Sequence, residues 1–218
     1  MLIAGRWTAL QTFTIGAPET VLRKKSPSEL SLGPHTRSVA PRGECLQPGE
    51  RSGQTTCMTV HQVRVETDIS APPQRVWDLI TDITLMPRFS SELQSAEWDD
   101  GFDSPRLGAR FLGTNRHPAI GEWTTLCVVT CFEVPRSFGW AVGDGDEPAA
   151  TWRFDIEPTG AQTRLHYTAQ LGDGPSGVTM LIDRDPGRAD EIIAKRLRQW
   201  RAGMAATLAG FKELAETG

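Results

Sequence analysis

The chain has 218 residues, of which 39% are hydrophobic and 23% charged, a globular composition with room for one domain of ordinary size. Its formal net charge is -4 and it contains no long basic run, which excludes nucleic acid as an expected partner. Its apolar runs fall far short of the roughly 20 residues that a membrane-spanning helix needs. The sequence therefore predicts a soluble, cytoplasmic protein without a transmembrane segment.

Residues 1–57 are rich in proline, glycine, serine and threonine and show no sustained hydrophobic period. Two interpretations stay open. The segment is a disordered tail, because so few large apolar residues cannot offset the entropy of ordering it, or Met58 is the true initiator and the upstream residues are a spurious extension. A cleavable signal is not expected, because Arg6 interrupts an apolar stretch that is already too short. Residues 58–218 are predicted to form the folded domain.

The domain opens with a predicted strand and two short helical segments. Residues 62–69 alternate between apolar and charged side chains, which indicates a half-buried strand. The prolines at 72 and 73 then favour a helix start, and an amphipathic helix should end near Asp82. The Met86–Pro87 pair breaks that pattern, so a short helical turn is expected within residues 84–91.

The next eighty residues read almost entirely as strands separated by turn sequences. The predicted strands are residues 92–98, 109–116, 122–134, 137–142, 150–157 and 162–171. Their short connections indicate antiparallel hairpins. In the last two strands apolar and polar residues alternate, so the sheet should have one dry face and one wet face. By this alternation Tyr167 points inward and His166 points to solvent.

The segment 185–215 is predicted to be one long helix, with Asp185 as N-cap and Pro186 at the first helical position. Its apolar residues recur every three or four positions and form a stripe that needs a broad apolar partner. The preceding residues 172–177 are predicted to be a mobile connection through which a ligand could enter. The fold class is therefore α+β with a helix-grip arrangement: a curved seven-stranded antiparallel sheet wrapped around the helix, with an internal cavity between them.

The cysteines indicate neither a metal site nor a disulfide within the strands. Cys45, Cys57, Cys127 and Cys131 have no recognised metal spacing. Cys127 and Cys131 share strand parity, so they would lie roughly 13 Å apart and are expected to be two small buried residues in a reducing compartment. The acidic group Asp144, Asp146 and Glu147 is predicted to be a solvated hairpin tip. No metal and no cofactor are expected.

Three groups of residues resemble a known family. They are ISAPPQRVW at 69–77 followed by LITD at 79–82; GARF at 108–111 with WTT at 123–125; and EVPR at 133–136, FGW at 138–140 and WRF at 152–154. These residues are similar to the polyketide cyclase/dehydrase-like branch of the START and birch-pollen-allergen (SRPBCC, helix-grip) superfamily, over about residues 60–214. The resemblance implies a small apolar ligand or lipid held between sheet and helix and, in some relatives, cyclisation or dehydration of a polyketide chain. No catalytic set is shared across such proteins, so none is carried over.

Candidate site residues follow from strand parity and from the helix stripe. Asn115 and Tyr167 are weak catalytic candidates, because each can offer a polar group to a ligand oxygen; the alternatives are an amide bonded to neighbouring backbone and a core ring. The residues predicted to contact ligand are Phe111, Asn115, Trp123, Trp140, Trp152, Phe154, Tyr167, Trp200 and Met204. For the aromatic residues, core packing is the other interpretation.

The leading functional hypothesis is binding of a hydrophobic small molecule or lipid by a monomer or homodimer. The first alternative is a cofactor-independent cyclase or dehydratase in which Asn115 and Tyr167 act on a carbonyl. The second is a protein-interaction module, which predicts an exposed apolar patch on the outer face of the sheet.

Overall fold

The computed structural model describes residues 60–118, 121–143 and 146–217. The predictions for residues 1–57 and for Asp144 lie outside these residues.

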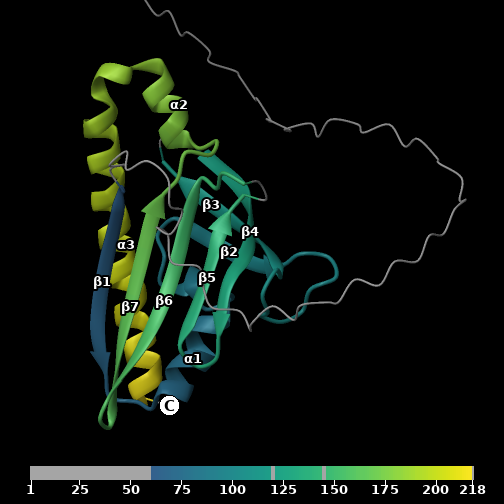
Figure 1. Cartoon of the computed structure of the whole chain (residues 1–218), viewed down its shortest axis with the longest axis vertical. Helices are drawn as coiled ribbons and strands as arrows, with labels where there is room; N and C mark the ends of the chain where they lie inside the picture. Colours follow the sequence, from purple (N-terminus) through teal and green to yellow (C-terminus); the bar gives the residue numbers. More distant parts are fainter. Residues whose placement is uncertain (1–59, 119–120, 144–145, 218) are drawn as a thin grey trace, which may run out of the picture. The chain divides into compact units, whose positions relative to one another are not determined.

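Seven strands form a single antiparallel sheet, as the sequence predicted (Figure 1). They are β1 (Gln62–Ile69), β2 (Leu93–Trp98), β3 (Arg110–His117), β4 (Gly121–Glu133), β5 (Ser137–Val142), β6 (Ala150–Thr159) and β7 (Gln162–Leu171). Their order across the sheet is β1-β7-β6-β5-β4-β3-β2, so the first two strands of the chain are its two edges. The segment between those strands must therefore cross from one edge of the sheet to the other.

That crossing segment contains the two predicted short helices, α1 (Pro73–Thr81) and the 3-10 turn η1 (Met86–Arg88). Pro73 is the first residue of α1 and Pro87 the second residue of η1, positions where the missing proline N–H leaves no backbone hydrogen bond unmade. On α1 the buried residues include Val76, Trp77 and Ile80. The helix packs against β6, β7 and α3. The helix-grip prediction for this half of the molecule is confirmed.

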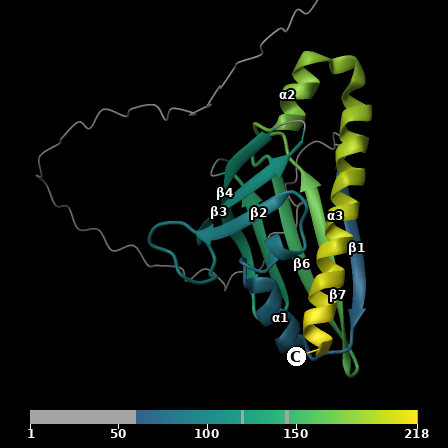
Figure 2. The same ribbon diagram turned by 180° about the vertical axis from the view of Figure 1, so that it is seen from behind.

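The long helix α3 (Ala189–Thr217) begins three residues after Pro186, the predicted first helical position. Asp185 is not its N-cap: it ends an unpredicted helix, α2 (Gly177–Arg184), and precedes a 3-10 turn, η2 (Pro186–Arg188). Together α2 and α3 form a helical hairpin (Figures 1 and 2). The pattern of apolar residues did not reveal α2, because this helix buries only Val178 and so has almost no apolar stripe.

Backbone hydrogen bonds join the connection before α2 to residues 148 and 149. The Gly172 N–H donates to the Ala149 carbonyl at 3.0 Å, and the Gly174 N–H donates to the Pro148 carbonyl at 3.2 Å. A Cβ on either glycine would overlap the backbone of residues 147–149. The two glycines therefore let these two segments of the chain pack closely against each other. Ser176 then caps α2 by accepting from the Thr179 N–H at 3.1 Å.

The helix α3 lies over the concave face of the sheet but packs mainly along β1 and against α1 (Figure 2). Aromatic and branched side chains fill this side of the interior, with Phe154, Phe211 and Leu165 completely buried. The rings of Phe154 and Phe211 meet edge to face with centroids 5.8 Å apart. A solid core is thus built at one side of the sheet, while the far strands curve away from the helix.

A bulge in β4 overturns the predicted parity of the two strand cysteines. Val129 pairs with Trp140, but the register then shifts, and Cys131 pairs with Gly139. The extra residue places Cys131 on the outer face, whereas Cys127 remains on the inner face. Cys127 is a buried free thiol, as expected.

No helix in the part of the chain that the structure describes has the length and apolarity needed to span a bilayer.

Candidate functional site

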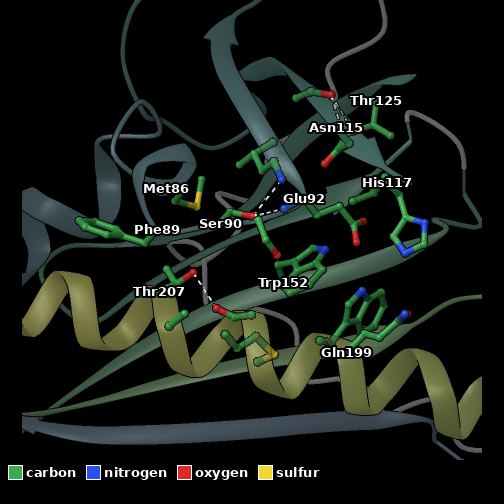
Figure 3. Close-up of a pocket in the computed structure, with 18 of the residues that line it drawn as sticks. Met86, Phe89, Ser90, Glu92, Asn115, His117, Thr125, Trp152, Gln199 and Thr207 are labelled. Carbon is green, nitrogen blue, oxygen red and sulfur yellow. Dashed lines mark hydrogen bonds between the residues drawn. The ribbon is translucent and has the colours of Figure 1, made fainter. Parts of the chain in front are cut away.

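A cavity of about 680 Å³ lies between α3 and the strands that curve away from it (Figure 3). Its volume falls within the range of pockets that bind small organic molecules. The η1–β2 corner contributes Met86, Phe89, Ser90, Ser91, Glu92 and Leu93. The sheet contributes Phe111, Gly113, Asn115, Arg116, His117, Pro118, Thr125, Cys127, Trp140, Val142, Trp152 and Tyr167. The helix α3 contributes Gln199, Trp200, Ala202, Gly203, Met204, Ala206 and Thr207.

Two glycines on α3 explain where the interior is open and where it is closed. A Cβ added to Gly203 would meet no atom within 4 Å, because this residue faces the cavity. A Cβ added to Gly210, two turns later, would overlap the ring of Phe89. Gly210 therefore lets the η1 segment close onto the helix. Gly203 leaves space, although glycine disfavours the helix by about 1 kcal/mol relative to alanine.

The inner wall of the cavity is aromatic. The Trp140 and Trp152 rings lie nearly parallel, at 12° with centroids 6.4 Å apart, and the Trp152 and Trp200 centroids are 4.8 Å apart. The buried Trp200 indole N–H has no acceptor among the described residues. Met204 is 2% exposed and adds an adaptable apolar side chain. Such a wall suits a flat or flexible apolar ligand.

Tyr167 brings one hydroxyl into this apolar wall. Its ring stacks on Phe154, with centroids 4.0 Å apart. Among the described residues, none forms a hydrogen bond with its hydroxyl. Burial raises the pKa of Tyr167 well above its ordinary range, and the charge of the neighbouring Cys127 raises it further by a smaller amount. The hydroxyl is therefore neutral and is able to donate or accept a hydrogen bond.

Asn115 also lines the cavity, on the strand opposite α3. Its amide nitrogen donates to the Gly113 carbonyl at 3.0 Å and to Thr125 Oγ1 at 3.4 Å. Its side-chain carbonyl has no partner among the described residues. The amide is thus held by its own strand, as one predicted alternative had it, while its oxygen is left to accept a hydrogen bond.

Cys127 is a third polar group on the inner face. Burial raises the pKa of its thiol to about 12, against a smaller opposing effect of the hydrogen bond with Thr125. The thiol is therefore neutral at physiological pH, and a neutral thiol is a poor nucleophile.

The raised pKa of the Cys127 thiol predicts a loss of stability at alkaline pH. An unfolded thiol titrates near 9.0, so above that pH the unfolded state loses a proton that the folded state keeps. Between pH 8 and pH 10 this group should lower the free energy of unfolding by about 1.4 kcal/mol. Urea unfolding of the wild type and of Cys127→Ala at both pH values measures the effect. Equal losses in the two proteins would contradict this account.

At the rim of the cavity, Glu92 forms a two-pronged ion pair with Arg196 of α3. The Arg196 Nη1 and Nη2 atoms lie 2.8 and 2.6 Å from the two Glu92 carboxylate oxygens. The Glu92 side chain is only 28% exposed and the Arg196 side chain only 19%. The guanidinium carbon of Arg196 also lies 5.3 Å from the centroid of the Trp200 ring. This pair joins the η1–β2 corner to α3, and neither residue was predicted as part of the site.

Most residues predicted to contact ligand do line the cavity. Those that line it are Phe111, Asn115, Trp140, Trp152, Tyr167, Trp200 and Met204. Trp123 and Phe154 do not. Trp123 pairs with Asn115 and shares its inward parity, but its side chain does not border the cavity. Phe154 is completely buried between Tyr167 and Phe211 and belongs to the core.

His166 is buried, contrary to its predicted exposure, although it does lie on the outer face of the sheet. Its Nδ1 atom lies 3.1 Å from a Glu66 carboxylate oxygen, and its Nε2 atom lies 3.1 Å from a Glu157 oxygen. These side chains from the two neighbouring strands cover the ring, so strand parity gave the face correctly but not the exposure. Among the described residues, no group of three His, Cys, Asp or Glu side chains is placed to hold a metal ion.

Comparison with known proteins places these features in context. A family model described as "Polyketide cyclase / dehydrase and lipid transport" matches residues 60–216. No curated protein matches the chain. Among solved structures, the chain is similar to the Polyketide_cyc-like protein Cgl2372 from Corynebacterium glutamicum, at 28% identity and a TM-score of 0.52. That alignment covers 72% of this chain and 92% of the other.

Two di-domain ARO/CYC proteins have a similar fold. StfQ, from the steffimycin biosynthetic pathway, aligns at 14% identity and a TM-score of 0.57, covering 72% of this chain and 51% of the other. BexL, from the BE-7585A biosynthetic pathway, aligns at 19% identity and a TM-score of 0.55, covering 72% of this chain and 50% of the other. The chain spans about half the length of each, and at these identities the likeness shows the fold alone.

Proposed function

The chain belongs to the polyketide cyclase/dehydrase and lipid transport family, and from this premise we propose that it binds an apolar small molecule or lipid between α3 and the sheet. The observation that carries the proposal is the aromatic-walled cavity of about 680 Å³. Each 100 Å² of apolar ligand surface removed from water there contributes roughly 2.5 kcal/mol to binding. The hydroxyl of Tyr167 and the side-chain carbonyl of Asn115, which have no partners among the described residues, give the ligand two places to form a hydrogen bond.

Native mass spectrometry of gently purified protein, followed by solvent extraction, tests this proposal. We expect a bound apolar molecule that leaves on mild activation, or one-to-one uptake of an apolar compound added to the empty protein. A protein that carries nothing and takes up no apolar compound would contradict the proposal.

We propose cyclisation or dehydration of a polyketide chain as the second candidate function, without a cofactor. It is favoured by one observation: Tyr167 and Asn115 bring hydrogen-bonding groups without partners among the described residues to a single cavity. In this scheme the neutral Tyr167 hydroxyl donates to a ligand carbonyl and polarises it.

Tyr167→Phe separates this candidate from simple binding. The enzyme hypothesis predicts that turnover of a linear poly-β-ketone falls by about 100-fold or more, the usual contribution of a general acid. Stability should hardly change, because the hydroxyl has no partner among the described residues. Unchanged turnover in Tyr167→Phe would eliminate this role for Tyr167, and the binding proposal would stand without it.

The interaction-module alternative is less well supported. On the outer face, β1, β6 and β7 carry ion pairs between cross-strand or same-strand neighbours, such as Arg164 with Asp68 and Arg153 with Asp155. Leu112 is an exposed large apolar residue there, at 39%. A single exposed leucine is ordinary for a protein surface and does not define a docking patch.

A further inference from the structure

The charges of the cavity lining are balanced by partners from outside the lining. The lining residues with a full charge are Glu92 and Arg116, among those that the structure describes. Glu92 is paired with Arg196, and Arg116 is paired with Glu122 at 2.8 Å. The remaining described wall is apolar or holds neutral polar groups, together with the imidazole of His117. A charged ligand group would therefore enter without a free counter-ion.

The two ion pairs differ in how strongly water screens them. The Arg116 and Glu122 side chains are 65% and 54% exposed, so their charges are well solvated. Arg196 and Glu92 are 19% and 28% exposed, and both nitrogens of the guanidinium fork are occupied by the carboxylate. The second pair therefore controls the electrostatic character of the inner rim, where the low dielectric strengthens interactions between charges.

Taking a charge out of water without a partner costs several kcal/mol, which is more than a few apolar contacts return. We infer that the cavity selects uncharged ligands over anionic ones of the same shape, and that Glu92 determines this selectivity by neutralising Arg196. The inference rests on the proposed binding function and adds to it the charge class of the ligand. It also makes Glu92 a specificity-determining residue at the rim.

Glu92→Gln is the critical variant, because glutamine keeps the size of the side chain and removes its charge. The Arg196 guanidinium is then left without its counter-ion beside the cavity, where an anionic ligand group can pair with it. Glu92→Gln should thus bind anions better than the wild type does. The double variant Glu92→Gln/Arg196→Gln has a neutral rim again and should regain the preference for uncharged ligands.

Two fluorescent probes with the same ring skeleton test the inference: uncharged N-phenyl-1-naphthylamine and its sulfonate, 1-anilinonaphthalene-8-sulfonate. Dissociation constants are measured at about pH 8.5, above the range in which imidazoles ordinarily titrate. We expect the wild type to bind the uncharged probe at least about 10-fold more tightly, a difference of about 1.4 kcal/mol. In Glu92→Gln the ratio should fall by at least about 10-fold, and in the double variant it should return.

Glu97→Gln is the matched control, since Glu97 is exposed, lies on β2 and faces away from the cavity. It changes the net charge equally and should leave the probe ratio unchanged. Equal wild-type affinities for the two probes, or an unchanged ratio in Glu92→Gln, would overturn the inference while the binding function stands. If the uncharged probe does not bind at all, the binding function falls and this inference falls with it. Should Glu92→Gln fail to fold, the double variant and Arg196→Gln still decide the question. Arg196→Gln leaves the Glu92 carboxylate without its partner and should weaken binding of the sulfonate further.

Discussion

Replacing Gly210 by alanine will lower the free energy of unfolding by about 1–3 kcal/mol, the usual effect of forcing an extra methyl group into a packed core. The new Cβ overlaps the Phe89 ring at several atoms, with Cε1 only 2.5 Å away. Phe89 cannot simply rotate aside, because its ring packs edge to face on Phe211, with centroids 5.7 Å apart. The η1 corner must therefore move away from α3. Thermal and urea unfolding measure the loss.

Gly203→Ala is the internal control on the same helix. Here the added methyl group meets nothing within 4 Å, so only the helix propensity changes, and stability should rise by up to about 1 kcal/mol. Opposite signs for two identical substitutions would support the assignment of Gly210 to close packing and Gly203 to the cavity. Similar effects at both positions would contradict it.

Replacing Gly203 by phenylalanine will weaken ligand binding without unfolding the protein. The side chain enters open space and occupies the part of the cavity beside Trp200 and Met204. A ligand must then move aside or overlap the ring, which costs about 1–3 kcal/mol and weakens binding by about 10-fold to 100-fold. The measurement is titration with N-phenyl-1-naphthylamine, together with the melting temperature of each protein.

Ala205→Phe serves as the matched control for that substitution. Ala205 is exposed on α3 and does not line the cavity, so the same aromatic ring added there should leave the probe affinity unchanged. An unaffected affinity in Gly203→Phe would show that ligand binds elsewhere. An equal loss in both variants would point to a general effect of the added ring on the helix.

The sheet could be predicted closely from the sequence because strands and hairpins leave local signals. Alternation of apolar and polar residues identified β1, β6 and β7, and turn sequences separated the strands between them. The resemblance to a known family agreed with the same order of elements. The helix α2 was missed because it is eight residues long and buries only Val178, so it has almost no hydrophobic stripe.

The position of the cavity could be predicted only in part. Parity placed Trp152 and Tyr167 on the inner face, and both line the cavity. Parity alone could not say which inward-facing side chains border the cavity: Trp123 shares the parity of its partner Asn115, yet only Asn115 lines the cavity. Nor could parity say which inward rings other rings cover, and Phe154 is covered by Phe211.

The rim of the cavity left no signal that the sequence analysis could have used. Phe89 and Glu92 lie in an irregular corner without a hydrophobic period, and Glu92 meets Arg196 across 104 positions of the chain. That pairing arises from the fold, because the corner returns to the helix only after the whole sheet has formed. The burial of His166 also arises from the fold, because Glu66 and Glu157 on the neighbouring strands cover its ring. Parity therefore gave the correct face of the sheet but the wrong degree of exposure.

The central claim is that an apolar ligand binds between α3 and the sheet, and the indole N–H signals of the protein test it most directly. The chain has seven tryptophans. Trp140, Trp152 and Trp200 line the cavity, whereas Trp77, Trp98 and Trp123 do not. In a ¹H–¹⁵N spectrum recorded during titration with N-phenyl-1-naphthylamine, we predict large saturable shifts for the first three signals and small ones for the other three. Saturable binding that leaves the signals of Trp140, Trp152 and Trp200 unmoved would contradict the claim.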